Sequence, residues 1–495
     1  MRFVIIGSGA AGVRAAETLR QIFPSGEARR SGNSFEDSGV QVDGRPEDGQ
    51  VTVTLVSAED FPPYSRCLLP AYLAGRCREE DLTIRPRDFF RKLGINLLLG
   101  REALAVDPGK KVVKLADGEE LPYDRLLIAT GAASRFPPIP GIDRPQVFGL
   151  RHLADARAIE QACVQMCTRP GAHAGAHAGA QPDSDSRLVA QTRSVVVIGG
   201  GFVGVEAAYA LIRRWGAQLE VTVVEKEAQI LPAQFDAYAA GMLQREMEKE
   251  GIRFILGRQV GEIVGQERPD HEAGREVGDR CRVVLTGSGT AGDSGEESLP
   301  ADLIIVAAGI TPNTAWAASA GPAVRRGILI DDYLETSVPG IYAAGDVAEF
   351  RTLSPERAGA LPTWTPIWPN ASAQGRIAAY NMASRRRACR GLIGLQNAVE
   401  FREVPAIAMG LVEPPVPAKG ESGESAYMVL VKAEPEQRRY KKLVLYKNAL
   451  VGMVLVGDIS QAGVYGALLR KKTDVSRFAD TIMNDNFNCG HLRSL

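Results

Sequence analysis

Residues 3–12 read Phe-Val-Ile-Ile-Gly-Ser-Gly-Ala-Ala-Gly, and an apolar periodic segment follows at 13–22. The first apolar run predicts a buried strand, and the later segment predicts a helix. In a glycine turn between strand and helix, Gly7 permits the tight turn, Gly9 lets the backbone approach a pyrophosphate, and Gly12 lets the helix pack closely on the strand. The N–H groups at the start of the helix then face a phosphate.

The same arrangement recurs at residues 195–204, which read Val-Val-Val-Ile-Gly-Gly-Gly-Phe-Val-Gly and precede a helical pattern at 205–214. Another apolar strand follows each helix, at 51–56 in the first case and at 219–224 in the second. Each set forms a βαβ unit, and each unit seeds a doubly wound parallel sheet. The sequence therefore predicts an α/β fold with two Rossmann-like dinucleotide-binding domains.

An acidic residue at the end of the second strand of such a unit usually binds ribose hydroxyls. In the second unit this residue is Glu225, whose carboxylate accepts from a 2′-OH and repels a 2′-phosphate. That favours NADH over NADPH, although the neighbouring Lys226 weakens the preference. In the first unit the corresponding position is Ser57, followed by Glu59, so the ribose contact of the first nucleotide stays open.

Composition limits the partners and the compartment. Lys plus Arg number 58 and Asp plus Glu number 59, so the net charge of −1 gives no reason to expect nucleic acid or a membrane surface as partner. The seven cysteines lack the spacing of a disulfide framework, a zinc finger or an iron–sulfur site, so no metal is expected. A strand predicted from residue 2 leaves no room for a signal peptide, which favours a cytoplasmic protein.

The domain plan follows from the two units and the segments between them. The first dinucleotide domain is expected at 1–150, with a polar insertion at about 24–50, and its second part at 327–396. The second dinucleotide domain is expected at 151–326, with a low-complexity linker at about 169–188 and a long hairpin loop at 267–297. A C-terminal α+β domain is expected at 397–495. There the pattern predicts strands at 399–409, 427–432, 442–446 and 450–456, followed by helices at 460–471 and 474–484.

Further motifs between and after the glycine turns resemble those of a known family. Residues 123–131 end in Ala-Thr-Gly, residues 308–313 read Ala-Gly-Ile-Thr-Pro-Asn, and residues 336–347 end in Ala-Ala-Gly-Asp-Val. With the two glycine motifs, in this order, the chain resembles the two-dinucleotide flavoproteins, also called the pyridine nucleotide–disulfide oxidoreductases. Residues 368–376 are similar to the family's helix start beneath the flavin ring, where a helix N-terminus stabilises negative charge.

The resemblance implies FAD at the first glycine turn and NADH, with NADPH as the alternative, at the second. In the family, an aspartate at the position of Asp346 bonds the ribityl chain of FAD, and a glutamate at the position of Glu206 lies near the nicotinamide. The residues expected to bind FAD are Gly7, Gly9, Ala10, Ala11, Gly12, Ser57, Glu59, Arg66, Ala103, Thr130, Gly131, Asp346 and Val347. Those expected to bind NADH are Gly199, Gly201, Phe202, Val203, Gly204, Glu206, Glu225 and Gly309.

Residues 62–75 indicate which branches of the family the chain resembles. They lack the closely spaced cysteine pair of glutathione- and lipoamide-type disulfide reductases. The Pro-x-Tyr-x-Arg stretch ending at Arg66 is similar to rubredoxin reductases and to the flavin domain of NADH-dependent nitrite reductases. Cys67 stands where NADH oxidases and coenzyme A-disulfide reductases carry their redox cysteine, and a thiolate beside Arg66 and a flavin is open to activation. A cysteine that only packs beside FAD is the other interpretation.

Three functions follow from these motifs. The first is an FAD-dependent NADH:acceptor oxidoreductase that passes electrons to a redox protein or partner enzyme, such as a rubredoxin-like or iron–sulfur protein. The second is an NADH oxidase or coenzyme A-disulfide reductase that uses Cys67 as catalytic residue, with oxygen or a disulfide as acceptor. The third is an electron-entry or scaffold subunit of a larger complex. The C-terminal domain resembles the family's dimerisation domain, so a homodimer is expected.

Overall fold

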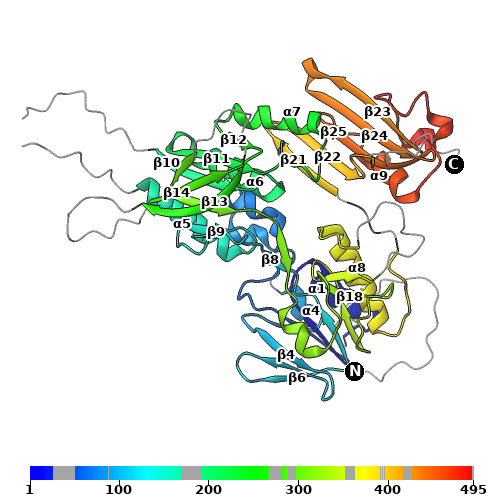
Figure 1. Ribbon diagram of the computed structural model, residues 1–495. Coiled ribbons are helices and arrows are strands. Elements are labelled where there is room, and N and C mark those ends of the chain that lie inside the picture. Colours follow the sequence, from blue (N-terminus) through cyan, green and yellow to red (C-terminus); the bar gives the residue numbers. More distant parts are fainter. Residues whose placement is uncertain are drawn as a thin grey trace, which may run out of the picture.

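The computed structural model in Figure 1 describes most of the chain. The described residues are 1–25, 51–86, 88–168, 192–266, 280–287, 297–351, 363–390, 392, 394, 396–415 and 426–492. Of the predicted insertion, residues 26–50 lie outside this set, and so does the whole predicted linker. Among the described residues, no helix is long and apolar enough to cross a membrane.

The first glycine turn belongs to a five-stranded parallel sheet with the order β19-β7-β1-β2-β3. The strands are β1 (Arg2–Ile6), β2 (Thr52–Val56), β3 (Ile95–Leu98), β7 (Arg125–Ile128) and β19 (Ile341–Ala343). Apart from Leu97 and Leu98 on the edge strand β3, which are partly buried, their apolar side chains are almost fully buried, as expected for strands covered on both faces. Helices α1 (Ala10–Ile22) and α8 (Trp368–Met382) pack against each other beside this sheet (Figure 1).

The second glycine turn belongs to another five-stranded parallel sheet, with the order β12-β11-β10-β16-β9. Its strands are β9 (Val147–Gly149), β10 (Arg193–Ile198), β11 (Leu219–Glu225), β12 (Arg253–Leu256) and β16 (Leu303–Val306). The helices that accompany it are α5 (Leu153–Thr168), α6 (Phe202–Trp215) and α7 (Ala237–Glu248). Both predicted βαβ units are present, and the predicted α/β fold class is confirmed.

Smaller antiparallel sheets extend the two parallel ones. One contains β4 (Ala103–Asp107), β5 (Val112–Leu115) and β6 (Glu120–Pro122). Another contains β13 (Gln259–Gln266), β14 (Arg280–Thr286) and β15 (Ser298–Ala301). The prediction of a single loop at 267–297 is therefore wrong in part. Strand β14 falls inside that range and buries Cys281 and the run Val283, Val284 and Leu285, a short apolar segment that polar segments on both sides conceal.

Two short strands connect the halves of the molecule. Strand β8 (Ala132–Ser134) follows the Ala-Thr-Gly segment and pairs antiparallel with β17 (Ile310–Pro312). The Thr130 hydroxyl donates to the Asn313 carbonyl at 3.1 Å, and the Asn313 amide donates back to the Thr130 carbonyl at 2.9 Å. The chain leaves and re-enters the first parallel sheet at this ribbon, which holds the two dinucleotide folds together.

The C-terminal domain is a five-stranded antiparallel sheet with the order β21-β22-β25-β24-β23, and α9 (Ala462–Lys471) packs on one of its faces. The strands are β21 (Gln396–Phe401), β22 (Val404–Gly410), β23 (Tyr427–Glu434), β24 (Arg439–Tyr446) and β25 (Ala449–Val456). The single strand predicted at 399–409 is wrong, because Arg402 and Glu403 both adopt positive φ and form a tight turn without a glycine signal. The helix predicted at 474–484 is also wrong: only a short 3-10 turn, Ser476–Phe478, forms there.

The C-terminal sheet packs on the second dinucleotide fold (Figure 1). The rings of Tyr209 on α6 and Phe401 on β21 meet edge to face with centroids 5.0 Å apart. The Tyr440 hydroxyl donates to the buried carboxylate of Asp236, the N-cap of α7, at 3.2 Å. Strand β21 thus contacts α6 through Phe401, and it also packs on α7, which matters for the site.

One close helix contact gives a test of the fold. A Cβ atom at Gly375 on α8 would lie 2.0 Å from the carbonyl oxygen of Ala11 on α1. We expect Gly375→Ala to separate the helices, to cost about 1–3 kcal/mol of unfolding free energy, and to lower bound flavin in the purified protein. Urea unfolding and the flavin-to-protein absorbance ratio measure both effects.

Gly463→Ala is the matched control, because a Cβ there meets nothing within 4 Å and the residue is exposed on α9. It should leave stability unchanged or raise it slightly. Equal stability of the two variants would contradict the tight α1–α8 contact.

Candidate functional site

A single cavity of about 1180 Å³ joins the two dinucleotide folds. Both glycine turns line it, and so do segments after β7, β16 and β19, the start of α8 and the start of β21. Because the carboxyl ends of parallel strands carry the ligand crevice in such folds, the cavity lies where the topology predicts it. Its size suits ligands larger than a typical drug-sized molecule.

The glycines of each turn have different surroundings. A Cβ at Gly12 would lie 1.8 Å from the Gly7 carbonyl oxygen, and one at Gly204 would lie 1.9 Å from that of Gly199. These third glycines therefore permit helix and strand to touch. A Cβ at Gly9 or at its counterpart would meet nothing within 4 Å. That open space adjoins the first N–H groups of α1 and α6, and it fits a pyrophosphate approached closely by the backbone.

The end of β11 supplies the acidic residue of the second site. Glu225 is buried and lines the cavity, and its carboxylate accepts from the backbone N–H groups of Gly200 at 2.6 Å and Glu227 at 2.9 Å. These bonds fix the carboxylate beside the glycine turn. Lys226 lines the cavity as well, and its ammonium pairs with Glu227 at 3.2 Å. The cation is thus partly neutralised, which leaves the carboxylate as the dominant charge next to a ribose.

A hydrogen-bonded cluster lines the cavity on the side of the first fold. The Glu59 carboxylate accepts from the Tyr64 hydroxyl at 2.7 Å and the Arg66 guanidinium at 3.0 Å, and His152 Nδ1 lies 3.3 Å from it. Burial alone would raise the pKa of Glu59, but the His152 hydrogen bond, the Arg66 charge and the Tyr64 hydroxyl together lower it to about 2. The carboxylate stays charged and holds Arg66 in place.

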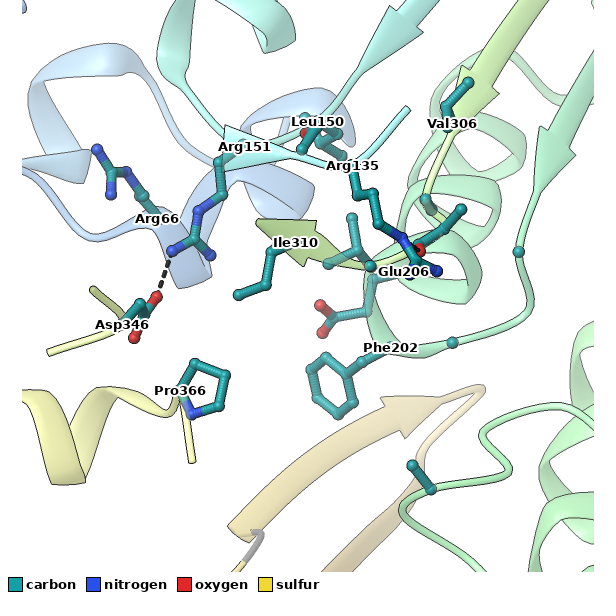
Figure 2. A pocket seen from close by; sticks show the side chains of 18 of the residues that line it. Arg66, Arg135, Leu150, Arg151, Phe202, Glu206, Val306, Ile310, Asp346 and Pro366 are labelled. Atoms are coloured by element: carbon teal, nitrogen blue, oxygen red, sulfur yellow. Dashed lines mark hydrogen bonds and ion pairs between the residues drawn. The ribbon is translucent and has the colours of Figure 1, made fainter. Parts of the chain in front are cut away.

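Asp346 follows β19 and lies at the cavity wall near the start of α8. Its carboxylate pairs with the Arg151 guanidinium, as the dashed line in Figure 2 shows. Arg151 also donates to the Ala132 carbonyl at 3.1 Å, so the ion pair joins the two folds. Next to it, the Gly345 N–H donates to Gln374 on α8 at 2.6 Å. The position of Asp346 is therefore set by its own segment after β19, by Arg151 after β9 and, through Gly345, by Gln374 on α8.

Glu206 and Phe202 project from the first turn and a half of α6 into the same cavity (Figure 2). Burial raises the pKa of the Glu206 carboxyl to about 8. Among the described residues no cation forms an ion pair with it, so nothing offsets the cost of burying its charge. Near neutral pH this carboxyl carries a proton and can donate a hydrogen bond in the space between the two glycine turns.

Cys67 also lines the cavity. Burial raises the pKa of its thiol, and the charge of Glu206 raises it further, while a hydrogen bond with Ser65 and the charge of Arg151 lower it less. Cys67 is exposed, and Arg66 is not among the groups that shift the pKa of its thiol, so the catalytic role expected of Cys67 stays a prediction. Cys67 is the one cysteine on the described wall, and no group of metal-ligating side chains occurs among the described residues.

Most of the predicted binding residues lie on the cavity wall, and some lie behind it. The residues placed on the wall are Gly9, Ala10, Ala11, Glu59, Arg66, Gly131, Asp346, Gly199, Gly201, Phe202, Val203, Glu206, Glu225 and Gly309. Those behind it are Gly7, Gly12, Ser57, Ala103, Thr130, Val347 and Gly204. Gly7, Gly12 and Gly204 pack the turns, Ser57 accepts from the Ser8 hydroxyl at 2.9 Å, Thr130 bridges to Asn313, and Ala103 begins β4.

Sequence reasoning missed several wall residues. Arg151 follows β9 and lines the cavity with no motif of its own, and its neighbour His152, which is off the wall, lies 3.3 Å from Glu59. Gln396 and Asn397 come from the C-terminal domain, whose first strand was not expected to reach a dinucleotide site. The packing of the C-terminal sheet on α6 and α7 brings them there.

The comparisons with known proteins agree with this geometry. The family model described as "Pyridine nucleotide-disulphide oxidoreductase" matches residues 1–375. The model described as "Rubredoxin NAD+ reductase C-terminal domain" matches residues 408–473.

Curated relatives cover much of the chain. It is 29% identical over 479 residues to "Nitrite reductase [NAD(P)H]" of Bacillus subtilis (strain 168), covering 96% of this chain and 48% of that protein. It is 27% identical to the "Assimilatory nitrate reductase electron transfer subunit" of the same organism, covering 96% and 50%. It is 30% identical over 354 residues to "Rubredoxin-NAD(+) reductase" of Pseudomonas putida, covering 71% and 73%. The chain thus spans about half the length of the two Bacillus relatives.

Solved structures share the fold. A ferredoxin reductase for the CYP199A2 system from Rhodopseudomonas palustris superposes with a TM-score of 0.72 at 24% identity, covering 96% of this chain and 95% of that one. A NAD-dependent persulfide reductase from A. fulgidus gives 0.71 at 25% identity, covering 97% and 78%. The predicted family, enzyme class and cofactors are confirmed at this level. The chain belongs to the pyridine nucleotide-disulphide oxidoreductase family, as a flavin enzyme that uses FAD and NAD(P)H.

Proposed function

We propose that the chain is an FAD-dependent NADH:acceptor oxidoreductase that takes hydride from NADH and passes the electrons to a separate redox protein. The observation that carries the proposal is the single cavity lined by both glycine turns, with one cysteine, whose thiol pKa is raised, on its described wall. When bound, FAD supplies the redox chemistry, as acceptor of the hydride and donor of electrons to the partner.

The residues of the chain have distinct roles in this proposal. The first N–H groups of α1 and α6 bind the two pyrophosphates, and Glu225 favours an unphosphorylated ribose, hence NADH. Arg66, held by Glu59, and Asp346, held by Arg151, position FAD. Protonated Glu206 stands at the nicotinamide end, where a neutral carboxyl orients the ring without an opposing charge.

A rubredoxin-like or iron–sulfur protein is the acceptor class that we infer. Support comes from the match of residues 408–473 to a C-terminal domain named after rubredoxin reductase. It also comes from the names of the relatives, which include rubredoxin and nitrite reductases. The expected homodimer stays a prediction.

Two alternatives have some support. An oxidase or coenzyme A-disulfide reductase would use Cys67, which lines the cavity but has a raised pKa. An electron-entry subunit of a larger complex is supported by a relative named an electron transfer subunit and by the half-length match to it.

An anaerobic titration of the FAD-loaded protein with NADH, followed by visible absorbance, separates these functions. We expect full reduction of the flavin by one equivalent of NADH, with the same endpoint in Cys67→Ser. A second equivalent together with a long-wavelength thiolate–flavin band, both lost in Cys67→Ser, would favour the cysteine-dependent alternative. No reduction without an added partner would favour the subunit alternative.

A matched pair of glycine variants tests which turn holds which nucleotide. Gly9 and Gly201 have φ near −74° and −73°, which valine tolerates, and a Cβ at either points into open space. We expect Gly9→Val to yield protein without FAD. Gly201→Val should retain FAD and bind NAD+ about tenfold more weakly or worse, which corresponds to ~1.4 kcal/mol. Flavin absorbance and calorimetric titration measure the two effects, and the reverse outcome would interchange the sites.

Glu206 predicts a pH dependence of stability. Its folded-state pKa is raised from 4.5 to about 8 by burial, so between these values the folded chain holds a proton that the unfolded chain releases. Stability due to this group therefore falls as pH rises from 4.5 to 8, by up to about 1.4 kcal/mol per pH unit. Glu206→Gln should be more stable than the wild type at pH 8.5, with a gap that closes by pH 5. Urea unfolding at both pH values checks this, and a gap independent of pH would refute it.

A further inference from the structure

A run of arginines lies outside the cavity, in the second part of the first dinucleotide fold. The described residues 363–390 contain no acidic residue and five arginines, which are Arg376, Arg385, Arg386, Arg387 and Arg390. All of them except Arg385 are exposed. Because the whole chain has a net charge of −1, this positive charge is local and does not reflect the overall composition. Such a cluster creates a potential that attracts a partner of opposite charge.

Several arginines of this region lie over aromatic rings and not beside carboxylates. Three guanidinium carbons lie close to ring centroids: Arg326 at 3.8 Å from Trp364, Arg386 at 4.1 Å from Tyr333 and Arg387 at 3.8 Å from Tyr380. Among the described residues, none of these three arginines forms an ion pair. A guanidinium that stacks on a ring is held in place, yet it keeps its charge and its N–H donors for a partner.

The stacked pairs lie at the two ends of one face, which is formed by α8 and β18 (Ile328–Ile330). Just before the start of α8, Trp364 meets Arg326, which precedes β18. Near the end of α8, the Asn381 amide donates to the Tyr333 carbonyl, beyond the end of β18, at 2.7 Å. Figure 1 shows the two elements side by side. Since α8 has 15 residues, the ends of the face are roughly 20 Å apart.

Two carboxylates next to β18 are engaged by other groups. Glu349 on β20 (Ala348–Phe350) is buried, and it accepts from the Arg325 guanidinium at 2.9 Å and from the Arg326 N–H at 2.9 Å. Asp331 is partly buried and accepts from two backbone N–H groups, each at 2.9 Å. The charge of Glu349 is thus neutralised by Arg325, and neither carboxylate pairs with a stacked arginine.

Trp364 connects this face to the cavity. Its indole N–H donates to the Asp346 carbonyl at 2.8 Å, and Asp346 lines the cavity. Residues 366–369 also line the cavity, so the chain passes from the face to the cavity wall within two residues of Trp364. The face therefore lies on the outer side of the wall to which the proposed function assigns FAD.

We infer that the face formed by α8 and β18, with Arg326 at one end and Arg386 and Arg387 at the other, is the docking surface for an acidic protein that accepts single electrons. This inference rests on the proposed function and specifies the charge and the position of its partner. An acidic protein is favoured over nucleic acid because the face adjoins the redox site and the rest of the chain has no excess of positive charge.

The electron balance of the reaction fixes the number of partners. One NADH supplies two electrons, so two partner molecules are each reduced by one electron, and one NAD+ and one proton are released. Attraction between the arginines and acidic side chains raises the rate of encounter and orients the partner. A partner bound on this face contacts Trp364, one hydrogen bond away from the wall at Asp346.

The surface is tested by steady-state kinetics of FAD-loaded protein with NADH and a rubredoxin of net negative charge, at low ionic strength. We expect Arg386→Glu/Arg387→Glu to raise the KM for rubredoxin about tenfold and to leave kcat unchanged. The rate with menadione, a small uncharged acceptor, should equal that of the wild type. The difference in KM should shrink as the salt concentration rises to about 0.5 M, because salt screens exposed charges.

Two control variants separate docking from net charge and from folding. Arg386→Lys/Arg387→Lys keeps both charges and should keep the KM for rubredoxin within about twofold of the wild type. Arg470→Glu/Lys471→Glu is the matched control, because both side chains are exposed at the end of α9 in the C-terminal domain and the change in net charge is the same. It should leave the KM for rubredoxin close to that of the wild type.

Each other outcome overturns a defined statement. If Arg386→Glu/Arg387→Glu keeps the wild-type KM, or if both charge-reversed variants raise the KM equally, the face is not the docking surface. If that variant unfolds or loses flavin, Arg326→Glu at the other end of the face is measured in the same way and decides the question. If the wild type binds an RNA oligonucleotide through these arginines while rubredoxin kinetics stay unchanged in the variant, the face is a nucleic-acid site and the inference is overturned.

Failure of the proposed function gives different results. A wild type that reduces menadione with NADH but does not reduce rubredoxin would overturn both the acceptor class and this docking surface. A wild type that oxidises NADH with neither acceptor would overturn the proposed function itself.

Discussion

Both binding turns depend on a very close contact between a helix and the turn that precedes it. At Gly12 and Gly204 the helix lies so near the preceding turn that a single Cβ would reach within 1.8 and 1.9 Å of a carbonyl oxygen. This contact aims the first N–H groups of α1 and α6 at one cavity, since both helices start at the carboxyl edge of a parallel sheet. The first N–H groups of α1 and α6 can face a phosphate because no side chain lies between each helix and the preceding strand.

Electrostatics divides the cavity into unlike halves. On the first fold the charged groups are paired: Glu59 with Arg66, and Asp346 with Arg151. On the second fold Glu206 is partly buried without an ion-pairing cation among the described residues, and its pKa rises to about 8. A permanently charged half suits a tightly held ligand, and a half with a neutral carboxyl suits a ligand whose charge changes during hydride transfer.

The third domain completes the site from outside the nucleotide folds. Its sheet packs on α6 and α7 through Phe401 and Tyr440, and this contact carries the first residues of β21 to the cavity wall. A domain that the family resemblance suggests for dimerisation thus also contributes polar side chains to the site. A change in the packing of this sheet on α6 and α7 would therefore shift part of the cavity wall.

The sequence by itself determined the two βαβ units, the order of the domains and the positions of the glycine turns. These features depend on the local spacing of apolar residues and on turns that only glycine allows, so they can be predicted from the sequence alone. The tertiary structure alone decided the Arg151–Asp346 ion pair, the raised pKa of Glu206 and the arrival of Gln396 at the wall. Each of these features depends on burial or on contacts between residues that are far apart in the chain. The local sequence around one residue does not show which distant residues will contact it.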